Sequence, residues 1–189
     1  LAVQSIAILY SYWEGYVQSS FRLYIEYLNS LNIDFDMLCD ELIVFHMDKT
    51  FRQFREYPKK VRQKMNFYRG LKGHFEEKQH DIYPMVDTES NVGFEVLNKL
   101  LKQFSLEEFP EHWEAYTYPN SNLKEMLSVF IRYRNSVAHG GDISSEESIT
   151  QEVYSKYRKL IDDLMYAMHD KFLKGIQEQT YMKQDDNCF

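Results

Sequence analysis

Residues 123–141 read LKEMLSVFIRYRNSVAHGG, and this stretch decides the fold that the sequence predicts. Its apolar residues recur every three or four positions, which is the spacing of one face of an α-helix. Asn122 precedes the stretch and Glu125 follows three residues later, the pattern of a capping box at a helix start. Gly140 stands where a left-handed residue often closes a helix. The stretch therefore predicts a helix that starts at Asn122 and ends near His139.

The same helical spacing covers most of the 189 residues, and only 7 Gly and 4 Pro interrupt it. So few turn formers favour long helices over a β fold with many turns. We predict an all-α helical bundle of about four long helices plus one or two short helices. Residues 1–189 are expected to form a single domain, with about the last twelve residues as a frayed tail. Helices are expected at residues 2–31, 36–57, 59–71, 90–109, 122–139 and 144–176.

Composition excludes several classes of protein. No apolar run approaches the ~20 residues that span a bilayer, so we expect no membrane segment. The two cysteines lack the spacing of a zinc site or a disulfide framework, which favours a cytoplasmic protein. Cys39 lies in an apolar pattern and is expected to be a small buried side chain. The histidines show no ligand spacing, so we expect neither a metal nor another cofactor.

The charge is uneven along the chain. Residues 49–72 hold nine basic residues and one acid, Glu56, so this basic segment carries +8. The whole chain carries −7, which leaves −15 on the rest. A basic stripe on an acidic body can bind a polyanion at one place, although it can also be a solvated face that pairs with acidic helices. The residues expected to bind RNA are Lys59, Lys60, Arg62, Lys64 and Arg69.

The end of the predicted helix carries residue types that suit phosphodiester cleavage. His139 can take a proton from a ribose 2′-OH or give one to the leaving oxygen. The guanidinium of Arg134 can hold phosphate oxygens, and Asn135 can orient the pair. Arg134 and His139 are five residues apart, about 140° of rotation and about 7.5 Å of rise, so the arginine side chain must bend toward the histidine. Arg132 is a second candidate for the phosphate-binding role.

A structural interpretation of the same residues stays open. Arginine and histidine near a helix C-terminus interact well with the helix dipole and with free carbonyl groups. Such a pair needs no substrate.

The motif RNSVAHG at residues 134–140 resembles the signature of the HEPN superfamily, in which an arginine precedes a histidine by a short spacing. Two further stretches resemble a HEPN subgroup found in microbial defence and toxin–antitoxin-like loci. They are LYSYWEGYVQSSFRLYIEYL at residues 9–28 and ESNVGFEVLNKLLKQFSL at residues 89–106. The resemblance covers nearly the whole chain.

This resemblance implies a helical bundle that forms a homodimer, or a heterodimer with a homologous chain, through the motif helix. It also implies a metal-independent endoribonuclease in a defence or toxin–antitoxin-like setting. His139 would be the general acid or base, Arg134 would bind the phosphate, and Asn135 would support them. Other members of the superfamily do not cleave RNA and act as scaffolds, neutralising partners or nucleotide-binding modules. Both an antitoxin-like partner and this inactive alternative therefore remain open.

The first predicted helix contains two further residues of interest. In the family interpretation, Glu14 approaches the motif and binds Arg134 or His139, although an ordinary ion pair is the alternative. Gly15 lies inside the helix, where glycine costs roughly 1 kcal/mol against alanine. We expect it to allow close packing of a neighbouring helix.

Overall fold

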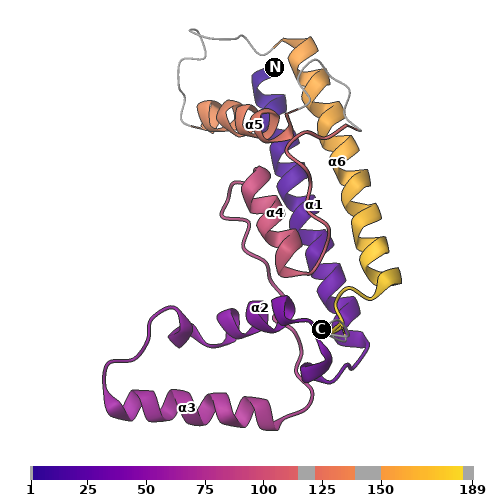
Figure 1. The fold of residues 1–189 in the computed structure, drawn as a ribbon. Helices are drawn as coiled ribbons and strands as arrows, with labels where there is room; N and C mark the ends of the chain where they lie inside the picture. The colour runs from indigo at the N-terminus through magenta and orange to yellow at the C-terminus, as the bar shows by residue number, and fades with distance from the viewer. Residues whose placement is uncertain (1, 115–121, 139–149, 185–189) are drawn as a thin grey trace.

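The computed structural model describes residues 2–114, 122–138 and 150–184. Within these residues the chain forms six α-helices, two 3₁₀ turns and no β-strand, so the predicted all-α fold is confirmed (Figure 1). No helix in this part of the chain is long and apolar enough to cross a membrane. The elements are α1 (Ala2–Ser30), η1 (Phe35–Met37), α2 (Asp40–Thr50), η2 (Arg52–Phe54), α3 (Val61–Glu76), α4 (Phe94–Gln103), α5 (Leu123–Ala138) and α6 (Gln151–Glu178).

The first helix, α1, is the element against which the bundle packs. Its 29 residues extend about 43 Å at 1.5 Å per residue. Helix α6 lies along it and α5 crosses it near its N-terminal end, as Figure 1 shows. Its core-facing residues are spaced by three or four positions, which explains why the apolar pattern predicted this helix correctly. Those buried to within 3% exposure are Ile6, Tyr10, Trp13, Val17, Phe21, Tyr24, Ile25 and Leu28.

The predicted helix at residues 36–57 is wrong in its bounds. Helix α2 begins only at Asp40 and ends at Thr50, and a 3₁₀ turn flanks it on each side. The late start is caused by a distant segment, because the Cys39 N–H donates to the carbonyl of Tyr181 at 2.8 Å and Leu38 pairs with Met182. These contacts keep the backbone at 38–39 extended. Cys39 is buried, as expected, and burial raises the pKa of its thiol.

The prediction of a frayed C-terminal tail is wrong for residues 179–183. Tyr181 is buried, and the Lys183 N–H donates to the Met37 carbonyl at 2.8 Å. Gln179 takes a left-handed conformation that ends α6 and turns the chain back onto η1. The tail therefore fastens the segment between α1 and α2.

Other helix bounds also differ from the prediction. Helix α4 spans only Phe94–Gln103, which is shorter at both ends than the predicted 90–109, and Gly93 precedes it. In α5, the Asn122 side chain accepts from the Glu125 N–H at 2.9 Å, which confirms the predicted cap. Thr150 caps α6 through a 3.2 Å bond from the Val153 N–H. The start predicted for that helix at residues 144–147 lies outside the described residues, as does Gly140.

Helix α3 and η2 form an arm at the end of the bundle away from α5 (Figure 1). None of the 16 residues of α3 is buried. The arm is joined to the body by rings around Phe35, whose centroid lies 5.3 Å from that of His74. His74 in turn stacks on His46 of α2, at 5.1 Å between centroids.

Gly15 does not allow close packing within the chain, which contradicts the prediction. A Cβ built at this position meets no described atom within 4 Å. Gly175 of α6 does allow close packing, because a Cβ there would collide with Leu106 Cδ2 and lie 3.4 Å from the Tyr24 hydroxyl.

Alanine substitution at the two glycines is expected to change the free energy of unfolding in opposite directions. Gly15→Ala should raise the free energy of unfolding by up to about 1 kcal/mol, because it adds helix propensity without a clash. Gly175→Ala should lower it by about 1–2 kcal/mol, because Leu106 must move in a packed core. Urea unfolding followed by circular dichroism measures both. A destabilised Gly15→Ala monomer would contradict the open surface at this position.

Candidate functional site

Arg134 lies on α5, one turn before the last residue of that helix. Its guanidinium carbon stands 4.3 Å from the centroid of the Tyr10 ring, in a cation–π contact. One guanidinium nitrogen donates to the Asn135 side-chain oxygen at 3.0 Å, and the other donates to the Ser90 carbonyl. No carboxylate of the described residues forms an ion pair with Arg134. Its orientation is therefore fixed, and no described carboxylate compensates its charge.

The loop that contacts Arg134 is fastened to α1. The Tyr10 hydroxyl accepts from the Val92 N–H at 2.7 Å and donates to the Ser90 carbonyl at 3.3 Å. The Trp13 indole N–H donates to the Val92 carbonyl at 2.9 Å. Because Val92 is buried, these bonds satisfy polar groups that water cannot reach.

Residues 88–92 form a strained turn. Glu89 and Ser90 are consecutive non-glycine residues with φ of 53° and 55°, the left-handed region that few such residues adopt. The Asp87 carboxylate accepts from the Glu89 N–H at 2.9 Å and supports the turn. Strain of this kind persists only where neighbouring contacts hold it, and it gathers at functional sites. Here the turn presents the Ser90 carbonyl to Arg134.

Tyr10 is a neutral positioning group. Burial raises the pKa of its hydroxyl above the ordinary value, and the Val92 N–H and Arg134 oppose this rise without cancelling it. At neutral pH the phenol therefore keeps its proton. It orients Arg134 and the loop, and it does not act as a base.

The candidate Glu14 lies on α1, half-buried, one turn after Tyr10. Its carboxylate accepts from the Thr88 hydroxyl at 2.9 Å, and Thr88 accepts in turn from the Gln18 amide at 3.0 Å. Glu14 thus reaches the same loop as Arg134, but its hydrogen bond goes to Thr88. A contact between Glu14 and His139 stays a prediction.

The remaining motif residues are placed as follows. Asn135 is half-buried and holds the Arg134 guanidinium. Arg132 is exposed, its backbone carbonyl accepts from the Ser136 hydroxyl at 3.0 Å, and its side chain has no hydrogen bond to a described residue. Of the two arginines, Arg134 is therefore the one held against the loop. His139 follows the last residue of α5 and lies outside the described residues.

The basic segment lies far from Arg134 within one chain. Arg134 contacts Tyr10 near the start of α1, whereas the arm with α3 follows the end of that helix (Figure 1). Twenty helical residues separate Tyr10 from Ser30, a distance of about 30 Å. The structure therefore does not bring the expected RNA-binding residues and the motif together in one pocket.

The cations of the arm point into solvent. Among the described residues, the ion pairs of this segment are local ones on the same helix or turn, Arg52–Glu56 at 3.0 Å and Lys72–Glu76 at 3.6 Å. The segment is therefore a solvated face, and within the described residues it does not pair with acidic helices elsewhere. All five expected RNA-binding residues are exposed and have no ion pair to a described carboxylate: Lys59, Lys60, Arg62, Lys64 and Arg69.

Three histidines lie together at the base of the arm. The rings of His74 and His80 stack at 3.6 Å, and His46 lies 5.1 Å from His74. Burial lowers the pKa of His46 to about 4, so this ring is neutral, and its Nδ1 accepts from the Tyr83 N–H at 3.2 Å. Stacked rings do not direct their nitrogens to a common point. No group of described residues has the geometry of a metal site.

A comparison with protein families identifies the family to which this arrangement of helices belongs. The sequence model of the RiboL-PSP-HEPN family matches residues 2–174, which include α1, the 88–92 loop, α5 and most of α6. The chain belongs to the RiboL-PSP-HEPN family. No curated protein sequence matches the chain significantly, and neither does any solved structure. The expected resemblance to HEPN domains is thus confirmed at the level of the family.

The sequence did not assign Tyr10 or Ser90 a role at Arg134, which both residues contact. Tyr10 lies four residues after Ile6 and three before Trp13, so helical spacing does place it on the buried face. Nothing in that spacing says that its hydroxyl bonds to a loop 80 residues away.

Removal of the Tyr10 hydroxyl should loosen the loop while the ring still stacks on Arg134. Tyr10→Phe should lower the free energy of unfolding by about 1–3 kcal/mol, because the buried Val92 N–H loses its acceptor. Tyr12→Phe is the matched control on the same helix, since Tyr12 is 70% exposed. Urea unfolding of the two variants checks this, and equal losses would contradict the role given to Tyr10.

Proposed function

We propose that this HEPN-family chain is a metal-independent endoribonuclease that acts in a defence or toxin–antitoxin-like setting. The observation that carries the proposal is Arg134, which is held by Tyr10 and by the strained 88–92 loop and forms no ion pair with a carboxylate of the described residues. A structural arginine at a helix end has no need of such a support. A phosphate-binding arginine does, because its guanidinium must be oriented before the substrate arrives.

The proposed chemistry uses the ribose of the substrate as the nucleophile. His139 removes the proton of the 2′-OH, the 2′-oxygen bonds to the adjacent phosphorus, and the bond from phosphorus to the 5′-oxygen breaks. The leaving 5′-oxygen takes a proton from a second acid. Arg134 binds the non-bridging oxygens and Asn135 keeps the guanidinium in place. The products are a 2′,3′-cyclic phosphate and a 5′-hydroxyl.

The second acid of this scheme is supplied most simply by a second protomer. In a homodimer, or a heterodimer with a homologous chain, each motif helix brings one histidine to a shared cleft. A neutralising antitoxin-like partner would then act by covering this cleft. These partners are part of the proposal.

A second candidate function is a binding module without cleavage. One observation favours it, namely that the outer side of α3 exposes apolar side chains to solvent, Val61 at 72%, Met65 at 48% and Tyr68 at 68%. Exposed apolar groups of this kind often mark an interaction surface. In this alternative, function survives loss of the motif and depends on the arm.

Cleavage of a mixed RNA pool in excess EDTA tests the proposed activity. The wild-type chain should cut and leave 2′,3′-cyclic phosphate ends. Loss of a general acid or base costs about 10²–10⁴-fold in rate, so His139→Ala should be inactive in this assay. Arg134→Ala should lose about 10²–10³-fold, because a transition-state partner is removed.

Arg132→Ala is the matched control, since it removes an exposed arginine two residues away on the same helix. This variant should keep its activity. Equal losses in Arg132→Ala and Arg134→Ala would contradict the assignment of the phosphate-binding residue. Absence of cutting by folded protein at all concentrations would favour the binding module.

A further inference from the structure

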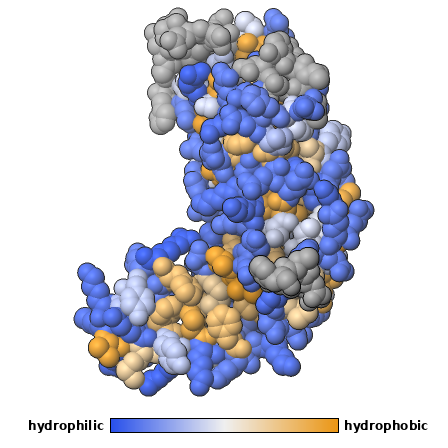
Figure 2. All heavy atoms as spheres, viewed as in Figure 1, coloured by the Kyte–Doolittle hydropathy of each residue, from blue (hydrophilic) through white to orange (hydrophobic). Residues whose placement is uncertain are grey.

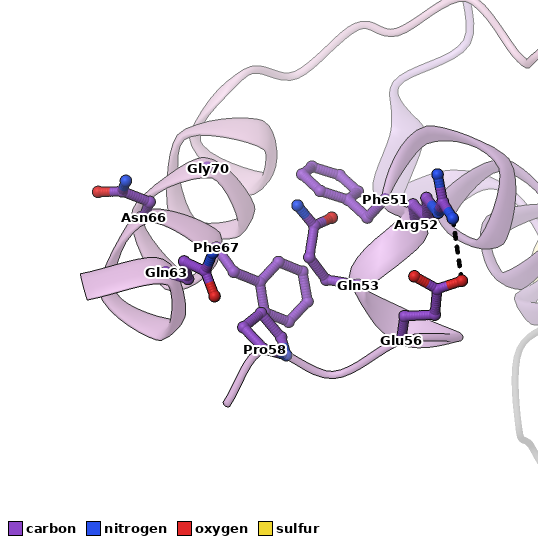
Figure 3. A pocket seen from close by; sticks show the side chains of 9 residues that line it. All are labelled: Phe51, Arg52, Gln53, Glu56, Pro58, Gln63, Asn66, Phe67 and Gly70. Carbon is purple, nitrogen blue, oxygen red and sulfur yellow. Dashed lines mark hydrogen bonds and ion pairs between the residues drawn. The ribbon is translucent and has the colours of Figure 1, made fainter. Parts of the chain in front are cut away.

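The arm contains a pocket that lies outside the motif site. It measures about 640 Å³ and lies between η2 and α3. Figure 3 shows the rings of Phe51 and Phe67 with Gln53 between them, and Gln63 and Asn66 on α3. The volume falls in the range of about 300–1,000 Å³ that is usual for small-molecule sites.

The pocket combines aromatic walls with amide groups. Phe67 stands 6.1 Å from Phe51 between ring centroids and belongs to a cluster of aromatic rings. The amides of Gln53, Gln63 and Asn66 form no hydrogen bond with a described residue. An amide offers both donors and an acceptor, which is what the edge of a nucleobase requires.

Exposed aromatic rings continue from the pocket to the surface of the arm. Tyr57 is 64% exposed, and the ammonium of Lys64 lies 5.1 Å from its ring centroid. Figure 2 shows apolar side chains gathered on the visible face of the arm with hydrophilic ones around them. Aromatic rings interleaved with cations are typical of surfaces that bind single-stranded nucleic acid, because unpaired bases stack while phosphates meet the cations.

The positive charge of the arm indicates that its ligand is a polyanion. The basic segment carries +8 against −15 on the rest of the chain, and its five expected RNA-binding residues have no ion pair with a described carboxylate. A neutral small molecule would leave these cations unexplained. We propose that the arm binds single-stranded RNA, with one unpaired base in the pocket lined by Phe51, Phe67 and the amides, and the phosphates on Lys60, Arg62 and Lys64.

A duplex does not fit this pocket, because its bases are stacked and paired and their edges are not free to enter. An anionic lipid surface would match the cations and the exposed apolar side of α3, but it would make no use of three free amides. The pocket therefore favours RNA.

The inference rests on the proposed nuclease only for the choice of RNA as the ligand. It adds a minimum length for a strand that contacts the arm and Arg134 at the same time. The arm and Arg134 of one chain are about 30 Å apart along α1. At 3.4 Å per stacked nucleotide, a strand of about nine nucleotides spans both. The arm thus selects single strands long enough to reach the motif.

Fluorescence anisotropy of the full chain tests the arm without cleavage. The protein carries His139→Ala, and the probe is a fluorescein-labelled single-stranded RNA of twelve nucleotides with mixed sequence. Gln63→Ala/Asn66→Ala should weaken binding about 5- to 50-fold with an unchanged salt dependence, because two neutral hydrogen bonds to a base are lost. Both residues are exposed, so the variant should fold.

A charge variant gives the complementary result. Arg62→Gln/Lys64→Gln should reduce the slope of log K against log salt by about 1.4, since each phosphate contact to a single strand contributes about 0.7. Arg22→Gln/Lys102→Gln removes the same charge from exposed positions on the body and should leave the slope unchanged.

Two results would overturn the inference. The first is a duplex of the same length that binds as tightly as the single strand, or a Gln63→Ala/Asn66→Ala variant that binds the single strand as tightly as its parent. The second is binding to phosphatidylserine vesicles that is tighter than RNA binding and is lost in Met65→Ser/Tyr68→Ser. If the arm binds single-stranded RNA but the wild-type chain never cuts it, only the proposed nuclease activity is contradicted. If the chain cuts RNA and no arm variant changes the cutting, only the proposed role of the arm is contradicted.

Discussion

The two hydrogen bonds that α1 makes with the backbone of Val92 hold the candidate site together. The Tyr10 hydroxyl accepts from its N–H at 2.7 Å and the Trp13 indole donates to its carbonyl at 2.9 Å. A buried peptide group without these partners would cost about 1–3 kcal/mol for each unsatisfied atom. The 88–92 loop therefore has one favourable position, and the Ser90 carbonyl orients Arg134 from that position.

The length of α1 separates two regions of opposite character. One end carries the motif helix, where a single arginine is fixed by a ring and a carbonyl. The other end carries an arm whose helix buries no residue and whose cations face solvent. The first arrangement is suited to act on one phosphate, and the second is suited to hold a long polyanion. A substrate that uses both must be extended.

The sequence predicted the elements that depend on local spacing. Apolar periodicity gave α1 almost to the residue, and Asn122 with Glu125 gave the start of α5. It failed where a distant segment decides the conformation. Helix α2 starts late because residues 181–183 pair with residues 37–39, and no local pattern contains that contact.

In the candidate site, too, the sequence predicted residues in a short local motif and missed residues whose role depends on distant contacts. Arg134 and Asn135 were predicted from a short motif whose residue types match the chemistry. Tyr10 and Ser90 were missed, because their role comes from contacts across 44 to 124 residues of chain. The stacked histidines were missed for a similar reason, since His46 reaches His74 only after the chain has turned back from η2 into α3.

Nitrogen-15 NMR of the arginine side chains tests the central claim most directly, namely that Arg134 is the phosphate-binding residue. The probe is a 2′-O-methyl RNA dinucleotide, which carries the phosphodiester and cannot be cut by its own 2′-OH. A saturable shift of the Arg134 Nε resonance, with Arg132 unchanged and Arg134→Lys abolishing binding, is the predicted result. A shift of Arg132 alone, or an Arg134 resonance that does not move at saturating dinucleotide, would contradict the claim.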